Sequence, residues 1–505
     1  MKRSPISTTS EWTFELVETY DREIGKIAAE YGLDTYRSQI EIISSEQMMD
    51  AYASVGMPLG YHHWSYGKQF LNIERSYSRG QMGLAYEIVI NSNPSIAYLM
   101  EENTMAMQAL VIAHACYGHN SFFKSNYLFT TWTDADSIID YLLFAKNYIE
   151  DCEQRHGIDE VEAILDSCHA LMNYGVDRYK RPHPISAAEE RIRQAERSEY
   201  LQKQVNDLWR TIPKLDPAET TEETLRFPEE PQENLLYFIE KNAPLLEPWQ
   251  REIVRIVRKI AQYFYPQRQT QVMNEGWACF WHYTLLNDLY DRGLVTEGFM
   301  LEFLEAHSSV IYQPPYDSPH YSGINPYTLG FKMMTDIRRI CEKPTAEDQE
   351  WFPEIAGSNW LDTLKFAMEN FKDESFILQY LSPTVMRDMK LFCVRDDDRE
   401  PNINVSAIHD DSGYQALREK LAGLYNLGNR EPNIQVYNVD VRGDRSLTLQ
   451  HIQHQRRPLA ANSCEEVLTH LHRLWGFDVH LNSLDDTKMT QHFQCPPAPE
   501  NTQED

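Results

Sequence analysis

The sequence lacks the motifs that bind nucleotides, cross membranes or form disulfide frameworks. Only 21 of its 505 residues are glycine, and neither a P-loop nor a GxGxxG segment after a strand occurs, which argues against nucleotide-driven and NAD-dependent chemistry. The eight cysteines form no CxxC pair, which favours a reducing compartment over a disulfide scaffold. The longest apolar run, Met105 to Gly118, contains Gln108 and His114 and is too short to cross a bilayer.

Basic residues are also in deficit. Lys and Arg number 47 against 76 Asp and Glu, so the formal net charge is −29. Such a charge repels nucleic-acid phosphates and anionic membranes. The first twenty residues contain no apolar segment of the secretory type, so we expect a soluble, cytoplasmic protein. The length and a hydrophobic content of 42% allow two or three domains with a substantial core.

Hydrophobic periodicity predicts a mainly helical body over residues 1–385, in which Leu84 to Ile90 is a strand candidate. An acidic, proline-containing segment at about 214–233 is expected to be exposed. From residue 390 to 485, short β-type runs alternate with helices in the order ββαββαβ, which predicts a small C-terminal α+β domain. Residues 486–505 are polar and proline-rich, and we expect a flexible tail.

One helical segment, Val272 to Tyr283, holds a carboxylate in apolar surroundings. Glu275 and His282 are seven residues apart and therefore lie within about 20° on one helix face. A carboxylate beside Trp277 and its aromatic neighbours is costly to bury unless it is paired, protonated or bound to a cation. Metal binding by Glu275 meets that requirement, whereas His282 is either a ligand or an ordinary core histidine.

A second segment, Ala106 to Asn120, contains His114, Cys116 and His119. On a straight α-helix His114 and His119 point about 140° apart, so both face one ion only if the helix is distorted. Gly118 permits such a bend. Cys116 and His119 are three residues apart and lie closer to one face.

Zinc accepts imidazole nitrogen, thiolate sulfur and carboxylate oxygen, and a catalytic zinc site usually has three protein ligands and one open position. The sequence therefore predicts a site for zinc or another divalent metal with His119 and Glu275 as its first ligands. His114, His282 and Cys116 are alternatives for the third position. The competing interpretation is that these histidines only pack or form hydrogen bonds in the core.

The segment MNEGWA at residues 273–278 resembles the second zinc-binding helix of gluzincin metallopeptidases, in which a glutamate is a ligand. Tyr117-Gly118-His119 resembles the end of their first zinc-binding helix. The sequence departs from the HExxH pattern, because Ala115 and Cys116 stand where that motif has its first histidine and its general-base glutamate. Either His114 substitutes through a helix bulge and another group is the base, or the chain is not a peptidase.

A broader resemblance, to the SpoVR family, covers nearly the whole chain. It is carried by ISSEQMM at 43–49, YHHWSYGK at 61–68, HACYGHN at 114–120, MNYGVDRY at 172–179 and GINPY at 323–327. The family is connected with sporulation and spore cortex formation. The resemblance implies association with a PrkA-type serine kinase and a YhbH-type protein in stress response, and it supplies no settled catalytic activity.

Further catalytic candidates lie in the loop from His320 to Tyr327. His320, Tyr321 and Tyr327 resemble, by position, the oxyanion-stabilising tyrosine or histidine of several zincin-like peptidases. The alternative is a surface loop that caps the following helix. Cys116 is also a candidate nucleophile with a histidine partner, but no orienting third residue is recognisable, so this interpretation ranks below metal chemistry.

Two functional hypotheses follow. In the first, a zincin-like helical body is a metal-dependent hydrolase of a peptide or peptidoglycan-type amide, and the strand at 84–90 pairs with an extended substrate. In the second, the chain is a non-catalytic scaffold or signalling partner of the kinase, and the C-terminal α+β domain is the docking element.

Overall fold

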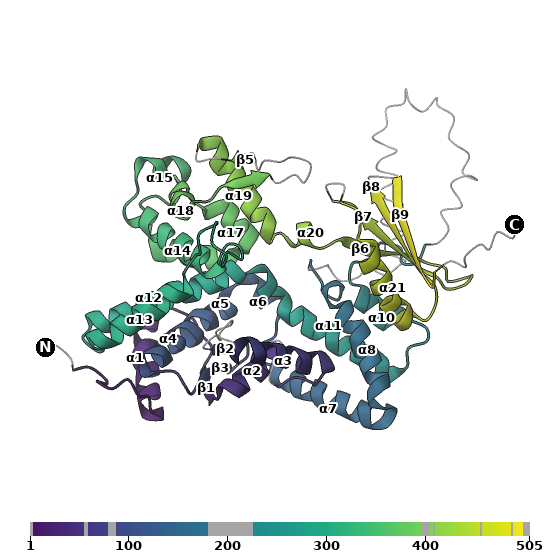
Figure 1. Cartoon of the computed structure of the whole chain (residues 1–505), viewed down its shortest axis with the longest axis horizontal. Helices are drawn as coiled ribbons and strands as arrows, with labels where there is room; N and C mark the ends of the chain where they lie inside the picture. The colour runs from purple at the N-terminus through teal and green to yellow at the C-terminus, as the bar shows by residue number, and fades with distance from the viewer. Residues whose placement is uncertain are drawn as a thin grey trace, which may run out of the picture. The chain divides into compact units, whose positions relative to one another are not determined.

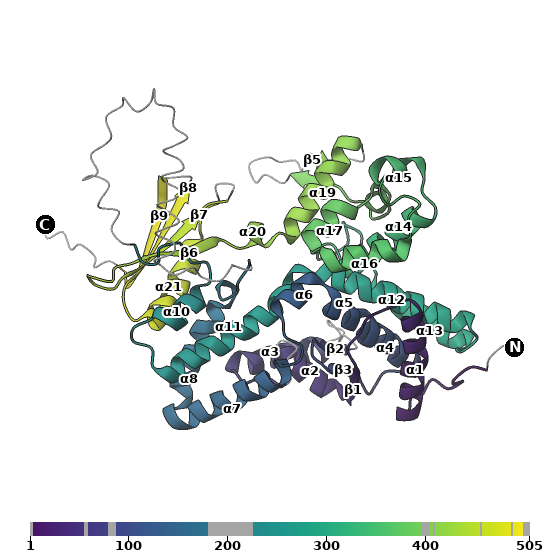
Figure 2. The ribbon, with the colours of Figure 1, turned by 180° about the vertical axis from the view of Figure 1, so that it is seen from behind.

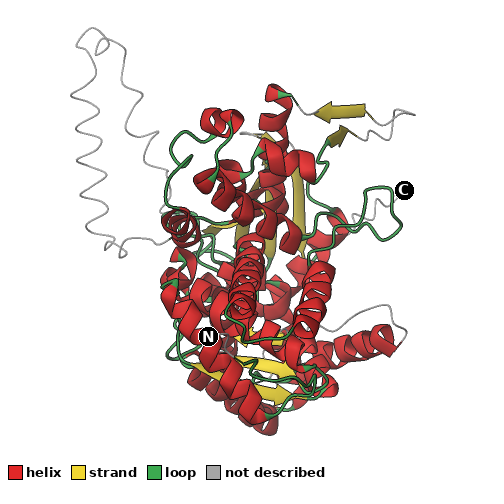
Figure 3. Cartoon of the chain, turned by 90° about the vertical axis from the view of Figure 1, so that its left-hand side faces the viewer, coloured by secondary structure: helices red, strands yellow, loops and turns green. Residues whose placement is uncertain are grey.

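The computed structural model describes residues 4–54, 59–78, 87–179, 226–395, 404–407, 410–454, 457–485 and 488–497. By their contacts they form two compact units. The first comprises residues 1–162 and 262–431, and the second comprises residues 163–261 and 432–505. Helices dominate the described chain, and the strands gather in small sheets (Figure 3).

The first unit contains a small three-stranded sheet and a large set of helices (Figure 1). In its N-terminal part the elements are α1 (Phe14–Glu30), β1 (Ser38–Ile43), α2 (Ser45–Ala53), α3 (Trp64–Ser78), β2 (Glu87–Ile90), β3 (Ser95–Met100), α4 (Met105–Ile112), the π-helix η1 (Ala113–His119), α5 (Asn120–Ser125), α6 (Tyr127–Trp132) and α7 (Ile138–His156). After residue 262 they are α12 (Gln271–Asp291), α13 (Glu297–Val310), α14 (Pro326–Glu342), α15 (Ala346–Trp351), α16 (Trp360–Asn370), α17 (Asp373–Tyr380), α18 (Pro383–Asp388), β4 (Cys393–Arg395), β5 (Asn404–Ala407), α19 (Asp411–Tyr425) and α20 (Leu427–Arg430).

The first unit has a three-stranded sheet in the order β1-β3-β2 and a separate antiparallel pair of β4 and β5. β1 runs parallel to β3, with Ser38 opposite Ser95, and β2 runs antiparallel to β3, with Glu87 opposite Leu99. The strand predicted at 84–90 is thus confirmed over residues 87–90, and residues 84–86 lie outside the described residues. Within the described residues β2 pairs only with β3, so it is an edge strand of this sheet.

Helix α12 is the central element of the first unit. It contacts η1 and α14, and Figures 1 and 2 both show it running beside α4 and α5. Its side chains are buried on nearly all faces, and Trp277 and Trp281 are fully buried, as expected for a helix that is apolar all round. Asp373 caps its first turn, because its carboxylate accepts hydrogen bonds from the backbone N–H groups of Val272 and Met273, both at 2.9 Å.

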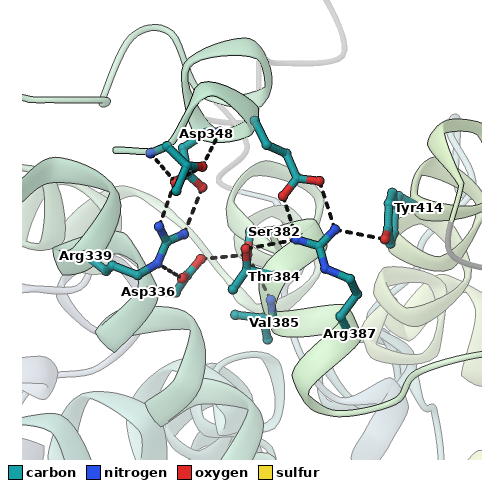
Figure 4. A network of polar contacts seen from close by, with 10 residues as sticks. Asp336, Arg339, Asp348, Ser382, Thr384, Val385, Arg387 and Tyr414 are labelled. Atoms are coloured by element: carbon teal, nitrogen blue, oxygen red, sulfur yellow. Dashed lines mark hydrogen bonds and ion pairs between the residues drawn. The ribbon is translucent and has the colours of Figure 1, made fainter. Parts of the chain in front are cut away.

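A polar network ties α19 to the helices of the first unit (Figure 4). Arg387 of α18 donates to Tyr414 of α19 at 2.9 Å and forms an ion pair with Glu347 of α15 at 2.6 Å. In the same region Arg339 donates to both carboxylate oxygens of Asp348, at 2.6 and 2.8 Å. The contact between Arg387 and Tyr414 helps to hold α19 to the helical body, with which residues 411–431 group, whereas the sequence predicts a boundary at residues 385–390.

The second unit contains a four-stranded sheet in the order β6-β7-β8-β9. β7 and β8 are parallel and are joined by the crossover helix α21, whereas the outer pairs are antiparallel. Its complete elements are η2 (Met172–Tyr174), α10 (Leu235–Asn242), β6 (Asn433–Val439), β7 (Leu447–Ile452), α21 (Ala461–Trp475), β8 (Val479–Asp485) and β9 (Lys488–Cys495). Helices α8 (Ile158–Ala170) and α11 (Pro248–Gln269) each have residues in both units.

The fold class predicted from the sequence, mainly α with a few strands and a small C-terminal α+β domain, is confirmed. One correction concerns the flexible tail predicted at 486–505: residues 488–495 form β9 and pair with β8. The polar sequence of this strand does not reveal the pairing, because a neighbouring strand supplies it. Residues 214–225 of the acidic segment and residues 498–505 lie outside the described residues, and in the remainder of the acidic segment Gln232 pairs with Val436 of β6.

No helix among the described residues is long and apolar enough to cross a membrane.

Candidate metal centre

The candidate centre begins with a local distortion of the helix that runs from α4 to α5. Residues 113–119 form the π-helix η1. A π-helix closes i→i+5 hydrogen bonds, so side chains five residues apart come onto one face. The rings of His114 and His119 accordingly meet edge to face, with centroids 4.6 Å apart. This is the distortion that the spacing of the two histidines requires.

Close backbone contacts bring two further helices to this face. A Cβ atom on Gly118 of η1 would lie 2.6 Å from Cα of Ala278 in α12, so only glycine permits this approach. A Cβ atom on Gly276 of α12 would lie 2.4 Å from Cα of Gly330 in α14. These three elements bring Glu275 of α12 close to His114, His119 and Tyr327.

Four side-chain atoms converge at the centre. Nε2 of His114 lies 3.1 Å from Oε1 of Glu87 and 3.8 Å from Oε2 of Glu275. Nε2 of His119 lies 3.6 and 3.5 Å from the same two oxygens. Ligands at 2.0–2.2 Å from a tetrahedral zinc ion are separated by about 3.3–3.6 Å, so the four distances bracket that geometry. Glu87, His114 and His119 are close enough together to hold one ion.

The pKa values of the two glutamates are shifted in opposite directions. Burial, followed by the charge of Glu275, raises the pKa of Glu87 well above its usual value. Burial also acts to raise the pKa of Glu275, but the neighbouring His119 and His114 and the hydroxyl of Tyr327 outweigh it and hold that pKa below its usual value. The first glutamate therefore tends to take up a proton, and the second stays a carboxylate.

Two carboxylate oxygens at the centre have no hydrogen-bond donor. Oε2 of Glu87 and Oε2 of Glu275 are buried and accept no hydrogen bond. A buried carboxylate without compensation is costly, and a cation removes that cost. Imidazole suits zinc, iron and nickel, and carboxylate suits magnesium and manganese, so this mixed ligand set fits zinc, iron or manganese. The residues present thus fit a divalent metal.

Hydrogen bonds behind the histidines orient their rings. Nδ1 of His119 donates to Oδ1 of Asn274 at 2.8 Å, which leaves the lone pair of Nε2 facing the glutamates. Nδ1 of His114 lies 2.8 Å from Nδ1 of His282, and Nε2 of His282 lies 2.7 Å from Nδ1 of His307. Both nitrogens of His282 are thus used by other imidazoles, which places His282 behind His114 and not beside Glu87.

A second group of possible ligands consists of His114, Cys279 and His282. The separation of 2.8 Å between its two Nδ1 atoms is a hydrogen-bond distance and is shorter than the separation of about 3.3 Å for two ligands of one zinc. Burial, followed by the charges of Glu275 and Glu87, raises the pKa of Cys279 well above its usual value, which keeps the thiol protonated. The better metal site is therefore the point where His114 and His119 meet Glu87 and Glu275, and either glutamate lies within reach of an ion held by the two histidines.

The structure separates the four residues predicted to be catalytic. Tyr327 lies next to Glu275, whose charge is the main cause of a raised pKa of the tyrosine, so the phenol stays protonated and can donate. Cys116 is buried near Ser38, and burial is the main cause of the raised pKa of its thiol. His320 is exposed and Tyr321 contacts the ring of Tyr316. Among the described residues no hydrogen bond or ion pair joins these last three to the centre.

Sequence reasoning missed Glu87, although the signal was present. Glu87 is the only acid in the apolar segment from residue 84 to 90, and the argument applied to Glu275, that such a carboxylate needs compensation, applies equally to Glu87. Asn274 and His307 were also missed. Asn274 belongs to the motif that drew attention to Glu275, whereas nothing in the sequence distinguishes His307.

These observations define a mainly helical protein with a candidate metal centre of two histidines and two glutamates. Residues 11–430 match the family described as SpoVR like protein, and residues 432–486 match the SpoVR-like C-terminal domain. The chain belongs to the SpoVR family. Over 493 residues it is 66% identical to the uncharacterized protein YcgB of Escherichia coli (strain K12), covering 97% of this chain and 96% of that protein. No solved structure matches the chain.

Proposed function

We propose that the chain is a metal-dependent hydrolase that cleaves an amide bond in a peptide or a peptidoglycan-type substrate. The observation that carries the proposal is the convergence of two imidazole nitrogens and two carboxylate oxygens at separations of 3.1–3.8 Å. Zinc is the first candidate for the ion. When bound, such an ion supplies a Lewis acid and lowers the pKa of bound water toward neutrality.

The opposite pKa shifts of the two glutamates support different roles. Glu275, with its lowered pKa, joins His114 and His119 as a permanent ligand. Glu87, with its raised pKa, is suited to accept a proton from the attacking water and to pass it to the leaving amine. This assignment supplies the general base that the HExxH-like segment lacks at Cys116.

Tyr327 and strand β2 complete the proposed reaction. Because its pKa is raised, Tyr327 keeps its proton and can donate a hydrogen bond to the substrate carbonyl as negative charge develops on that oxygen. Glu87 is the first residue of the edge strand β2. An extended peptide that adds to this strand would run past the proposed base.

The family resemblance suggests the cellular process in which the activity is used. We propose that the activity is used in the cytoplasm, in stress response or in sporulation and envelope maintenance, together with a PrkA-type kinase and a YhbH-type protein. The alternative is a non-catalytic scaffold of the same kinase system. It is favoured by β9, an edge strand on which Met489 is 61% exposed, because exposed strand edges suit docking.

Metal analysis and cleavage assays test the hydrolase. Protein purified without chelators should contain about one equivalent of zinc, iron or manganese per chain, and Glu275→Gln should lose it. Zinc-loaded protein should cleave amides in a mixture of synthetic peptides and muropeptides, followed by mass spectrometry. Glu87→Gln should retain metal but lose cleavage. Far less than one equivalent of each metal in the wild-type protein contradicts the proposal.

The scaffold hypothesis and the hydrolase hypothesis make different predictions for the stress or sporulation phenotype of cells that carry variants of the protein. If docking is the function, Met489→Asp on β9 should abolish the phenotype and Glu275→Gln should leave it intact. If hydrolysis is the function, the two variants should have the reverse effects. Circular dichroism of both purified variants provides the control for folding.

A further inference from the structure

Behind the candidate centre lies a chain of three buried imidazoles. The contact between Nδ1 of His114 and Nδ1 of His282 is 2.8 Å, and that between Nε2 of His282 and Nδ1 of His307 is 2.7 Å. His114 and His307 are 5% and 3% exposed, and His282 is fully buried. The rings come from η1, α12 and α13, so three separate elements are positioned to make this row.

A row of neutral imidazoles accounts for both contacts, because a ring nitrogen accepts a hydrogen bond only where it carries a lone pair. Burial lowers the pKa of His114 and of His307 to about 4 and lowers that of His282 well below its usual value. A neutral imidazole carries one N–H group and one lone pair. Each contact in the row therefore needs one ring to donate and the next to accept.

Only two proton arrangements satisfy both contacts. In the first, His114 donates from Nδ1 to His282, and His282 donates from Nε2 to Nδ1 of His307. Nε2 of His114 then carries a lone pair directed toward Glu87 and Glu275. In the second arrangement both donors are reversed, and His114 has its proton on Nε2, where Oε1 of Glu87 accepts it at 3.1 Å. Each ring holds one proton in both arrangements, so the net charge is the same.

We propose that His282 and His307 are positioning residues that fix the protonated nitrogen of His114 and so control metal affinity. This inference rests on the proposed metal centre. A divalent ion requires the lone pair of Nε2, which selects the first arrangement, and that arrangement needs His282 and His307 as successive acceptors. Without them, Nδ1–H of His114 would be buried without an acceptor, and the arrangement with the proton on Nε2 would be favoured.

The surroundings of His307 support its role as the last acceptor in the row of hydrogen bonds. Its ring packs against Tyr283 and Phe331, with centroids 4.9 and 4.8 Å away, and against Phe303 at 5.9 Å. These aromatic rings hold the imidazole in place, with Nδ1 of His307 2.7 Å from Nε2 of His282. The row is therefore buried and closely packed, and the proton positions along it are coupled from His307 to His114.

The test measures affinity for Zn²⁺ and Co²⁺ by competition with a chelator in the full-length protein. His282→Phe and His307→Phe preserve ring volume but remove an acceptor, and each should weaken binding by about 10–100-fold. His307→Gln offers a carbonyl oxygen to the Nε2–H group of His282 and should recover most of the loss. His451→Gln is the matched control, because His451 is another buried histidine with one hydrogen bond, to Ser483.

The absorption spectrum of the Co²⁺ form separates positioning from ligation. Weaker binding with an unchanged spectrum supports the proposal, because the ligands are the same. A changed spectrum in His282→Phe overturns it and makes His282 a ligand. Binding within twofold of wild type in both Phe variants also overturns it, while loss of binding in Glu275→Gln would leave the metal centre standing. If the wild-type protein itself binds neither ion, the proposed function fails first.

Discussion

Replacing Glu87 by glutamine should have opposite effects on stability and on catalysis. The side chain is largely buried, its pKa is raised well above the usual value, and one of its oxygens accepts no hydrogen bond. Glutamine has the same shape without the charge. At pH 7 the metal-free Glu87→Gln protein should therefore be more stable than the metal-free wild type, although it loses the proposed general base.

The size of the effect follows from burial and from the size of the first unit. A buried polar group without a partner costs about 1–3 kcal/mol. The first unit has about 330 residues, and unfolding entropy of about 2.1 cal/mol/K per residue gives about 0.7 kcal/mol/K. Glu87→Gln should thus raise the Tm of this unit by about 1–4 °C. Metal at 100 times its Kd contributes about 2.7 kcal/mol, or about 4 °C.

The assay is thermal unfolding of wild type, Glu87→Gln and Glu275→Gln, each with EDTA and with excess zinc. Zinc should raise the Tm of the first two proteins and leave that of Glu275→Gln unchanged. Because the folded-state pKa of Glu87 is raised, the wild type loses stability as pH rises from the unfolded pKa through the folded pKa. The advantage of Glu87→Gln should accordingly disappear toward pH 4.5. A variant that is less stable at pH 7, with a deficit independent of pH, would refute this reasoning.

Three further predictions concern packing, pH and transition-state stabilisation. Gly118→Ala places a Cβ atom 2.6 Å from Ala278 and should cost about 1–3 kcal/mol in urea unfolding, whereas Gly67→Ala, with open space around it, should be neutral or slightly stabilising. The pKa of His307 is lowered to about 4. Protonation therefore favours the unfolded state, and the free energy of unfolding falls as pH falls below 6.5. This loss should reach about 2 kcal/mol at pH 5 in metal-free protein, and it should be absent in His307→Phe. Tyr327→Phe should lower kcat of the zinc-saturated protein by about 10²–10³-fold, and an unaltered kcat would contradict its role as a donor.

The main features of the helical body could be predicted because they depend on local patterns. The all-round apolar character of the segment from 272 to 283 predicted a buried helix, and α12 is one. The same pattern made Glu275 conspicuous, and the structure places it 3.5 Å from Nε2 of His119. The strand at 87–90 was also visible as a short β-type run that ends at a turn.

Other features depend on contacts between distant residues, which a sequence pattern does not encode. Glu87 lies 27 residues from His114 along the chain and reaches it only because β2 pairs with β3. The π-helix η1 packs closely against α12, where Gly118 meets Ala278, a residue 160 positions further along the chain. The boundary between the units was also hidden, because α19 is held to the first unit by side-chain contacts such as that between Arg387 and Tyr414.

By itself, the sequence determined that a few charged or titratable side chains lie in strongly apolar helices, and the cost of burying them pointed to a metal or to a specific partner. Tertiary structure alone decided which atoms meet. It brought Glu87 to the centre and placed His282 behind His114. The physical reason is that apolar burial is a local average over composition, whereas ligation and hydrogen bonding depend on atomic positions within a few tenths of an ångström.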